Sequence, residues 1–477
     1  MGNTTTWVYD CLGRAVQETN ELGYTRSFVY NAAGYLLRQV DRLGRVRQFQ
    51  YDHLGRNTAE IWYNTTDDAD LDQNRQRTIS FSFDLAGQLT GVDDADADYT
   101  YSYDGLGRVT TLTQSLVGLT PMVTFSQAYD AAGRRTELAV SVNGAAEFIN
   151  QWTYDPLGRV VRITQRAQPG GRAVAPKRVD LAYDAAGQLT SLVRYADLAG
   201  TQLVAESDFG YDQAGRLRSL SHFRGQSSFV DYGWSFDAAG RMTQYVNSVD
   251  GTADYTSDAT GQLTAANYNY QDDESYQYDA NGNRVLANGQ SYTTGTNNRL
   301  LSDGTYRYLY DAEGNRTARF IDANQNGQLD AGDTDITEYT WDHRNRLVKV
   351  EHRAGYGAAV DRVIENYYDS ENRWVRRAID ARVPLLRQKQ CGNHRMALLA
   401  FRQAVAHGAR QLAGHAGGSP AAAVFVGGRP TSPGRKPGVD GATVTPEGVW
   451  HRGNEVLRLA PGAHAPGFRV TLFARVV

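Results

Sequence analysis

The chain has 477 residues, of which 41% are hydrophobic and 21% charged, and its net charge is −4. This composition supplies enough apolar residues for a core and excludes wholesale disorder, while no apolar run reaches the roughly 18 residues of a membrane-spanning helix. The two cysteines, Cys11 and Cys391, exclude a disulfide framework and a zinc site made of cysteines alone.

Charge divides the chain near residue 380. Residues 381–477 hold 13 Lys and Arg against three acids, a net charge of +10, which leaves −14 for residues 1–380. A region this negative disfavours a nucleic-acid partner, because phosphates repel it. The first residues lack the basic and apolar stretches of a signal peptide, so none is expected.

A hexapeptide, Tyr-Asp-x-x-Gly-Arg, recurs throughout residues 1–380. It begins at Tyr9, Tyr51, Tyr103 and Tyr154, and a variant begins at Tyr310. An active site is needed once, whereas a structural joint is needed many times, so the recurrence predicts repeat architecture and not a catalyst.

Each copy of the motif predicts a hairpin turn. The Asp can accept hydrogen bonds from the amides of its own turn, and the Gly adopts the positive φ that returns the chain into the next strand. Glycine fills this place at Gly13, Gly34, Gly55, Gly87, Gly107, Gly133, Gly158, Gly187, Gly215, Gly240, Gly261, Gly282 and Gly314. Only Asn345 and Asn372 depart from it. Asparagine best tolerates positive φ among the other residues, so we expect a backbone requirement here as well.

The turn spacing predicts the fold class. In the first sixty residues turns begin every ten or eleven residues, which leaves strands of about six residues in one antiparallel meander. Later units are longer and carry further hairpin signals, at Asn143-Gly144, Asp250-Gly251, Asn288-Gly289 and Asp303-Gly304. We therefore predict an all-β strip of antiparallel hairpins for residues 1–380.

An arginine follows the glycine in many units, at Arg14, Arg56, Arg108, Arg134, Arg159, Arg216 and Arg241. Stacked units would align these side chains into a ladder. The simpler interpretation places each guanidinium over a neighbouring tyrosine ring or against the turn Asp. The alternative is an aromatic groove that binds sugars.

The sequence predicts no catalytic or cofactor-binding residue. His53 and His343 fall at the variable positions of the turn, where we expect them to face solvent without a catalytic role.

One segment has the pattern of a calcium loop. Residues 322–333 place oxygen-bearing side chains at loop positions 1, 3, 5, 9 and 12 and a glycine at position 6, while position 7 offers its backbone carbonyl. The predicted Ca²⁺ ligands are Asp322, Asn324, Asn326, Gln328, Asp330 and Asp333. Leu329 would anchor the loop, and the flanking residues have the pattern of strands.

An Asx-rich hairpin loop that binds nothing is the alternative for residues 322–333. Two other acidic runs, at residues 67–72 and 93–98, lack the turn glycine and are more typical of solvated loop tips.

Residues 381–477 form a different compositional region, without tyrosine and with eight of the 12 prolines. Three interpretations stay open: a toxin domain, an out-of-frame translation, and a disordered basic extension. The basic, Gly-, Pro-, Ala- and Arg-rich composition favours a disordered or out-of-frame tail.

The recurrent hexapeptide resembles the Rhs/YD-repeat family over about residues 1–380. The resemblance implies a long β-sheet that winds into a shell. In the family such shells enclose a C-terminal toxin or form large surface and adhesion proteins, which implies a cell-surface or secreted location. Family shells end in a core segment with an Asp-Pro-x-Gly-Leu motif, which this sequence lacks, so no catalytic aspartate is carried over.

We therefore expect a non-enzymatic structural or interaction protein of the Rhs type, acting as a shell, an adhesion protein or a cell-surface scaffold. Its expected partners are other parts of a larger Rhs shell or cell-surface glycans. The alternatives are a carrier of a C-terminal toxin domain and a carbohydrate-binding surface protein.

Overall fold

The computed structural model describes residues 4–119, 121–381, 450–451 and 456–457. The chain divides into two units, Met1–Gln388 and Lys389–Val477. In the second unit the described residues form β34 (Trp450–His451) and β35 (Val456–Leu457), which pair antiparallel. Our other interpretations of the tail lie outside the described residues, and the predicted boundary at residue 380 stays a prediction.

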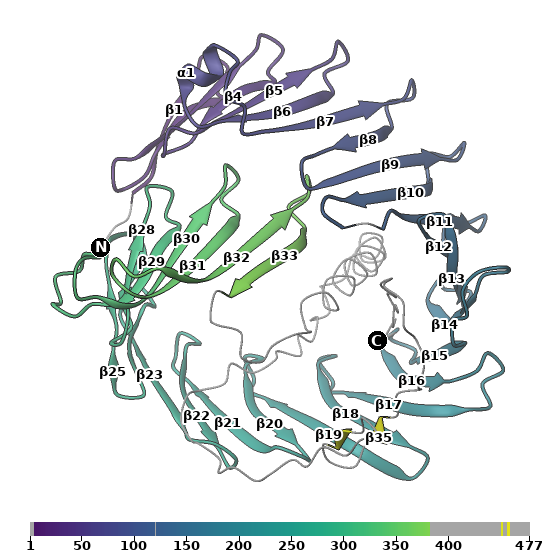
Figure 1. The fold of residues 1–477 in the computed structure, drawn as a ribbon. Coiled ribbons are helices and arrows are strands. Elements are labelled where there is room, and N and C mark those ends of the chain that lie inside the picture. The colour runs from purple at the N-terminus through teal and green to yellow at the C-terminus, as the bar shows by residue number, and fades with distance from the viewer. Residues whose placement is uncertain (1–3, 120, 382–449, 452–455, 458–477) are drawn as a thin grey trace. The chain divides into compact units, whose positions relative to one another are not determined.

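The first unit is a meander of antiparallel strands in two sheets, so the all-β prediction is confirmed (Figure 1). One sheet has 25 strands and the other eight. Within each sheet every strand pairs with the next strand along the chain, as β11–β12, β12–β13 and β13–β14 illustrate. Turns this short leave a strand no nearer partner than its neighbour in sequence.

The first thirteen strands of the first sheet are β1 (Thr6–Tyr9), β2 (Ala15–Thr19), β3 (Thr25–Tyr30), β4 (Leu36–Val40), β5 (Val46–Tyr51), β6 (Asn57–Tyr63), β7 (Arg77–Phe83), β8 (Leu89–Asp93), β9 (Ala97–Tyr103), β10 (Val109–Leu116), β11 (Val123–Tyr129), β12 (Arg135–Val142) and β13 (Ala145–Tyr154). The helix α1 (Thr66–Asp70) lies between β6 and β7.

The sheet continues through β14 (Val160–Ala167), β15 (Lys177–Tyr183), β16 (Leu189–Tyr195), β17 (Leu203–Tyr211), β18 (Leu217–Arg224), β19 (Ser227–Phe236), β20 (Met242–Asn247), β21 (Gly251–Ser257), β22 (Leu263–Tyr268), β23 (Glu274–Tyr278), β24 (Arg284–Ala287) and β25 (Gln290–Ser291).

The second sheet consists of β26 (Thr293–Thr294), β27 (Leu300–Ser302), β28 (Arg307–Tyr310), β29 (Arg316–Ile321), β30 (Thr334–Trp341), β31 (Leu347–Gly355), β32 (Val360–Tyr368) and β33 (Trp374–Ala381), with the 3₁₀ turn η1 (Thr296–Asn298) between its first two strands.

The hairpin turns have the predicted backbone. At the thirteen repeat glycines φ lies between +76° and +90°, and in a typical turn the Gly133 N–H donates to the Asp130 carbonyl at 3.0 Å. The strand register shifts by one residue just before Tyr129, as it does before the tyrosine of other repeats. A type I turn closed by a left-handed glycine and a bulge produces this geometry.

Both acidic runs differ from the expectation of a solvated loop tip. Residues 66–70 form α1, because the Thr65 side chain accepts a hydrogen bond from the Asp68 N–H at its N-terminus. In the run at 93–98, Asp94 is buried and lies 2.6 Å from an Arg77 guanidinium nitrogen. Burial raises the pKa of Asp94, and the hydrogen bond from Arg77 opposes this rise.

The apolar core occurs in small clusters, as a strip of strands with polar turns allows. One cluster joins Val46, Ile61 and Tyr63 on β5 and β6 with Ala69 of α1. Another joins Phe320 and Ile336 on β29 and β30. Within the described residues, no helix has the length and apolarity needed to cross a bilayer.

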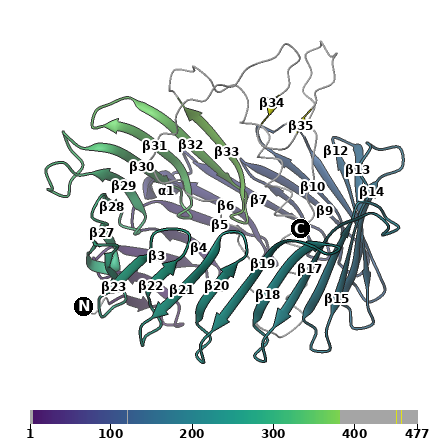
Figure 2. The ribbon, with the colours of Figure 1, turned by 90° about the horizontal axis from the view of Figure 1, so that it is seen from below.

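The end of the strip returns to its beginning. Figures 1 and 2 show β30–β33 beside strands of the β5–β10 region. Hydrogen bonds between residues about 260 to 300 apart in the chain establish this: Arg45 Nη1 donates to the Trp341 carbonyl at 2.9 Å, and Arg376 Nη1 to the Val117 carbonyl at 3.2 Å. The two sheets are therefore joined by side chains and not by a strand ladder.

Candidate functional site

Each repeat turn is a self-contained hydrogen-bonded unit. In the turn at Asp130, one carboxylate oxygen accepts from the Ala132 and Arg134 N–H groups at 3.0 and 2.9 Å. The other accepts from Arg134 Nε at 2.7 Å. The Arg134 N–H bond is the largest influence on the Asp130 carboxyl and lowers its pKa. The Asp of the motif is thus committed to its own turn.

Each unit is also tied to the next one. The Arg108 guanidinium lies 4.8 Å from the ring centre of Tyr129 and donates to the Asp130 carbonyl at 3.2 Å. In return the Tyr129 hydroxyl donates to the Val109 carbonyl at 2.7 Å. The same guanidinium-over-ring contact occurs for Arg14, Arg56, Arg134, Arg159 and Arg216. The predicted arginine ladder is confirmed in its simpler form.

A denser polar network joins the two sheets, and we call it the seam. Its members, which come from turns and strands of both sheets, are Arg26, Arg45, Glu60, Trp62, Tyr63, Arg77, Tyr99, Glu313, His343, Arg344, Asn345, Asp369 and Asn372.

Glu60 is the centre of the seam on β6. Its carboxylate accepts from Arg47 Nε at 2.7 Å on the neighbouring strand and from Arg344 Nη2 at 2.5 Å on the second sheet, and the Trp62 indole N–H donates to it at 2.7 Å. The side chain is only 4% exposed. Burial alone would raise its pKa, but the hydrogen bonds from Arg344 and Arg47 outweigh burial and lower the pKa to about 2. Glu60 is therefore a buried anion that holds both sheets.

Glu313 plays the same part at the other end of the seam. Its side chain has no exposed surface. It accepts from Arg26 Nε at 3.2 Å and from the Arg42 N–H at 2.6 Å, both on the first sheet. Burial pushes the pKa of Glu313 upward, and the bond from Arg26 together with that from the Arg42 backbone lowers it below its ordinary value.

His343 does not face solvent as expected. It is 9% exposed, its ring stacks on Trp62 at 5.1 Å between centres, and its Nε2 lies 2.8 Å from the Tyr63 carbonyl. A carbonyl only accepts, so Nε2 carries the proton and donates. Burial lowers the pKa of His343, which keeps the ring neutral. The variable position of this turn points into the seam because the two sheets meet there.

The two asparagines that replace glycine are also explained by the seam. Asn345 and Asn372 do have positive φ, +56° and +64°, so the backbone prediction holds. Their side chains add contacts that glycine lacks: Asn345 Oδ1 accepts from Arg45 at 3.1 Å, and Asn372 Oδ1 accepts from Arg344 at 3.1 Å. A backbone requirement alone is therefore an incomplete account of the substitution.

The seam extends to β9 through a fully buried carboxylate. Asp369 has no exposed surface and accepts from the Tyr99 hydroxyl at 2.8 Å and from Arg373 Nε at 2.6 Å. Nearby, Arg77 Nη2 donates to the Tyr368 carbonyl at 2.9 Å. The turn Asp of this repeat thus serves both its own turn and the first sheet.

Sequence reasoning missed Glu60 and Glu313, because the sequence around each follows the same pattern as the other repeats. The available signal was the departure of Asn345 and Asn372 from the glycine rule, which occurs only in the repeats that meet the first sheet. At Asn345 the departure marks a direct bond to the first sheet, from Arg45, whereas Asn372 accepts from Arg344 and Arg346 of the preceding repeat.

Replacing Asn345 by glycine tests this interpretation. We expect a loss of about 1–3 kcal/mol in the free energy of unfolding, because partly buried donors of Arg45 and Asn315 lose their acceptor. Urea unfolding measures the loss. Gly133→Asn is the control, since a Cβ there meets nothing within 4 Å and should change stability by less. A neutral or stabilising Asn345→Gly would show that only the backbone matters.

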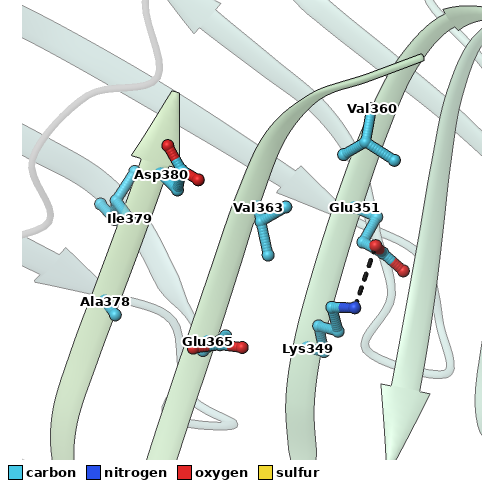
Figure 3. A pocket seen from close by; sticks show the side chains of 8 residues that line it. All are labelled: Lys349, Glu351, Val360, Val363, Glu365, Ala378, Ile379 and Asp380. Atoms are coloured by element: carbon cyan, nitrogen blue, oxygen red, sulfur yellow. Dashed lines mark ion pairs between the residues drawn. The ribbon is translucent and has the colours of Figure 1, made fainter. Parts of the chain in front are cut away.

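Two depressions lie on this part of the protein. One, of about 320 Å³, opens at the seam itself and is lined by Arg26, Arg47 and Arg344 among others, whose charges are matched by Glu60 and Glu313. The other, of about 340 Å³, lies across β31–β33 (Figure 3). There Lys349 Nζ is 3.0 Å from Glu351, and no Ser, Cys or His is among the eight lining residues. Neither depression presents a nucleophile paired with a base.

A histidine between two carboxylates is the strongest acid–base arrangement in the second sheet. His352 Nδ1 lies 2.6 Å from Asp361 and Nε2 lies 2.9 Å from Asp335. Burial lowers the pKa of His352, but the two carboxylates outweigh it and raise the pKa above its ordinary value. With both nitrogens bonded, the imidazolium links β30, β31 and β32 and has no free lone pair to act as a base.

The six predicted calcium ligands lie in the connection between β29 and β30, so the expected strand flanks are confirmed. The structure brings Asn324, Asn326 and Asp330 within hydrogen-bond distance of one another. In the described residues no group of three or more His, Cys, Asp or Glu side chains is arranged to hold a metal ion. The calcium assignment stays a prediction at this point.

Comparison with known proteins identifies the repeat. Residues 201–362 match the model of the teneurin YD-shell family, a segment that runs from the start of β17 into β32. This match confirms the YD-repeat resemblance. No curated protein matches the chain significantly.

Solved structures with some similarity include TcdB2-TccC3, a Tc holotoxin pore and a porin-like protein. The TcdB2-TccC3 structure without its hypervariable C-terminal region is 13% identical, with a TM-score of 0.26, over 79% of this chain and 27% of that chain. The Tc holotoxin pore of Photorhabdus luminescens is 13% identical, with a TM-score of 0.24 and the same coverage. A porin-like protein from Bacteroides uniformis is 11% identical, with a TM-score of 0.20, over 51% and 91%. This chain spans about a quarter of the length of the Tc proteins, and scores this low carry no argument about its function.

Proposed function

We propose that this chain, a YD-repeat protein of the Rhs type, serves as a non-catalytic structural wall of a YD shell. The observation that carries the proposal is the seam. It buries the carboxylates of Glu60, Glu313 and Asp369 to hold strands far apart in sequence together. A binding protein or an enzyme has no evident need for a strip clamped in this way, whereas a wall that must stay closed does.

The repeat chemistry supports the same role. The most polar groups of each unit, such as Asp130, Arg134 and the Tyr129 hydroxyl, are consumed by bonds within and between turns. Groups engaged in this way are held in place for structure and are not available to bind or transform a ligand. Partners in this proposal are other segments of a larger shell, and its location is the cell surface or the exterior.

Limited trypsin digestion of the full chain tests the proposal. Residues 1–380 contain 36 of the chain's 49 Lys and Arg, yet we expect most of these sites to resist cleavage in the native protein, because the turns that carry them are bonded to their neighbours. Arg344→Ala removes a seam arginine and should expose sites in β28–β33. Equal digestion of the wild type and the variant, with cleavage throughout the repeats, would contradict a closed wall.

A carrier role for the C-terminal region is a narrower proposal, supported by charge. Residues 1–380 carry −14 and residues 381–477 carry +10, so a wall of this kind would attract such a segment. The same digestion reports on it: protection of residues 382–477 in the wild type and their loss in Arg344→Ala is the expected pattern for an enclosed segment.

Glycan binding is the other candidate, and an aromatic group on β19 and β20 favours it. The rings of Tyr232, Trp234 and Tyr245 lie 6.1 to 6.3 Å apart, centre to centre. Binding to a glycan array that Trp234→Ala abolishes would support an adhesion role.

A further inference from the structure

The connection between β29 and β30 contains a carboxylate oxygen that is buried without a partner. The Asp322 side chain is 5% exposed. Its Oδ2 accepts from the Gly327 N–H at 2.8 Å and from Arg307 Nε at 3.2 Å, but Oδ1 has no hydrogen-bond partner. The bond to Gly327, half-way round the loop, fixes the carboxylate on the inside of the connection. Arg307 meets the charge of this carboxylate at Oδ2, but a buried Oδ1 without a donor is still costly and is free to accept a cation.

A second carboxylate is buried at the opposite end of the same connection. Asp333 is 1% exposed. Its Oδ1 accepts from the Ala323 N–H at 3.0 Å and its Oδ2 from the Asp330 N–H at 2.8 Å. These bonds tie the last residue of the loop to the first residues and hold both ends together. Each oxygen of a carboxylate has a further lone pair, so Asp333 retains the capacity to bind a cation.

The remaining oxygen-bearing side chains converge between these two ends. Asn324 Nδ2 and Asn326 Nδ2 both donate to Asp330, at 3.0 and 2.5 Å. A half-turn of each amide would replace the NH₂ group by its carbonyl oxygen at the same place. A cation would then meet oxygen from all three side chains, and its binding would have to offset the loss of two loop bonds, from the Asn326 N–H to Asn324 Oδ1 at 3.0 Å and from the Gln328 N–H to Asn326 Oδ1 at 2.7 Å.

The backbone already has the bends that such a loop needs. Gly327 at position 6 has φ of +76° and Gln325 at position 4 has φ of +59°. Leu329 at position 8 packs against the cluster of Phe320 and Ile336, as the sequence predicted. The loop is therefore anchored to the second sheet and leads from β29 directly into β30, so ordering it would stiffen the hairpin β29–β30.

We propose that residues 322–333 bind one Ca²⁺, through the side chains of Asp322, Asn324, Asn326, Asp330 and Asp333 and the backbone carbonyl of Gln328. Six oxygens of mixed type suit Ca²⁺, which accepts six to eight ligands in flexible geometry, better than Mg²⁺, which demands a near-ideal octahedron and keeps its waters. The shorter Asp at position 12, in place of Glu, predicts moderate affinity, with Kd of about 10⁻⁵ to 10⁻³ M.

Calorimetric titration of the full chain with CaCl₂ tests the proposal, after chelator has been removed. We expect one saturable site that Asp330→Asn weakens at least tenfold without altering the circular dichroism spectrum. Asp322→Asn is the second variant and should also weaken binding, so the test still stands if Asp330→Asn fails to fold. Asp67→Asn, in the acidic segment of α1, is the matched control and should bind as the wild type does.

Thermal melting supplies an independent readout. Ca²⁺ should raise the Tm of the wild type relative to EGTA, and the rise should vanish in Asp330→Asn but persist in Asp67→Asn. The proposal is overturned if no saturable binding occurs up to millimolar Ca²⁺, if Mg²⁺ competes equally at equal concentration, or if both loop variants bind as the wild type does. None of these outcomes depends on the wall function.

Discussion

Replacing Glu60 by glutamine is expected to lower the free energy of unfolding by about 3–5 kcal/mol, because it leaves the partly buried guanidinium groups of Arg344 and Arg47 without their buried anion. Equilibrium urea unfolding measures this loss. Glu338→Gln is the matched control: Glu338 pairs with Arg353 at 2.9 Å, but both side chains are about one-third exposed, so that pair should contribute less than about 1 kcal/mol.

The pH dependence of the free energy of unfolding provides a second test of the contribution of Glu60. The pKa of Glu60 is lowered to about 2 in the folded protein, from about 4.3 in an unfolded chain. Its contribution is therefore complete above the unfolded pKa and is lost as the pH falls from there towards about 2. Glu60→Gln should flatten the fall in stability over this window. Equal losses for Glu60→Gln and Glu338→Gln, with unchanged acid behaviour, would show that the seam does not hold the sheets.

Alanine substitutions at two glycines of one turn show whether the repeat glycine is required for its backbone conformation. Gly107 has φ of +77°, and a Cβ there would meet the flexible end of Gln88 at 3.2 Å. Gly107→Ala should therefore cost about 1–2 kcal/mol, the penalty of a left-handed L-residue. Gly105, two residues earlier, lacks positive φ, and a Cβ there meets nothing within 4 Å. Gly105→Ala should be neutral or stabilise by about 0.4–1 kcal/mol.

Urea unfolding of both variants, together with Gly107→Asn, distinguishes the two causes. Asparagine at position 107 should lose less than alanine, since it tolerates positive φ better. If Gly105→Ala and Gly107→Ala destabilise equally, the turn glycine is not selected for its backbone conformation, and the prediction from the repeat fails.

The turns and their ladder were predictable because both depend on residues close in sequence. Asp130, Gly133 and Arg134 lie within five positions, and the ring of Tyr154 that Arg134 covers belongs to the next unit. Local turn chemistry and the spacing of the hexapeptide contain all the information that these contacts need. The same holds for the strands that flank residues 322–333.

The seam was not predictable from the repeat alone. His343 looked like a solvent-exposed turn residue, and Glu60 like any polar strand residue, because their partners lie about 280 residues away. Which units meet depends on the twist accumulated over many strands, and no single unit encodes that sum. Only the change from glycine to asparagine at position 345, whose side chain accepts from Arg45 of the first sheet, recorded the meeting in the sequence.

The distance across the seam tests the central claim most directly. Spin labels at Leu71, which is 69% exposed after α1, and at the exposed Glu371 would lie on either side of it, with Cys11 and Cys391 replaced by serine. Pulsed electron–electron double resonance should give one narrow distance distribution when Glu60 is present. With Glu60→Gln added, the distribution should be broader and shifted to longer distances. A broad distribution in the labelled protein that keeps Glu60 would contradict the claim that the seam holds the two sheets together. An unchanged narrow distribution in the labelled Glu60→Gln variant would contradict it as well.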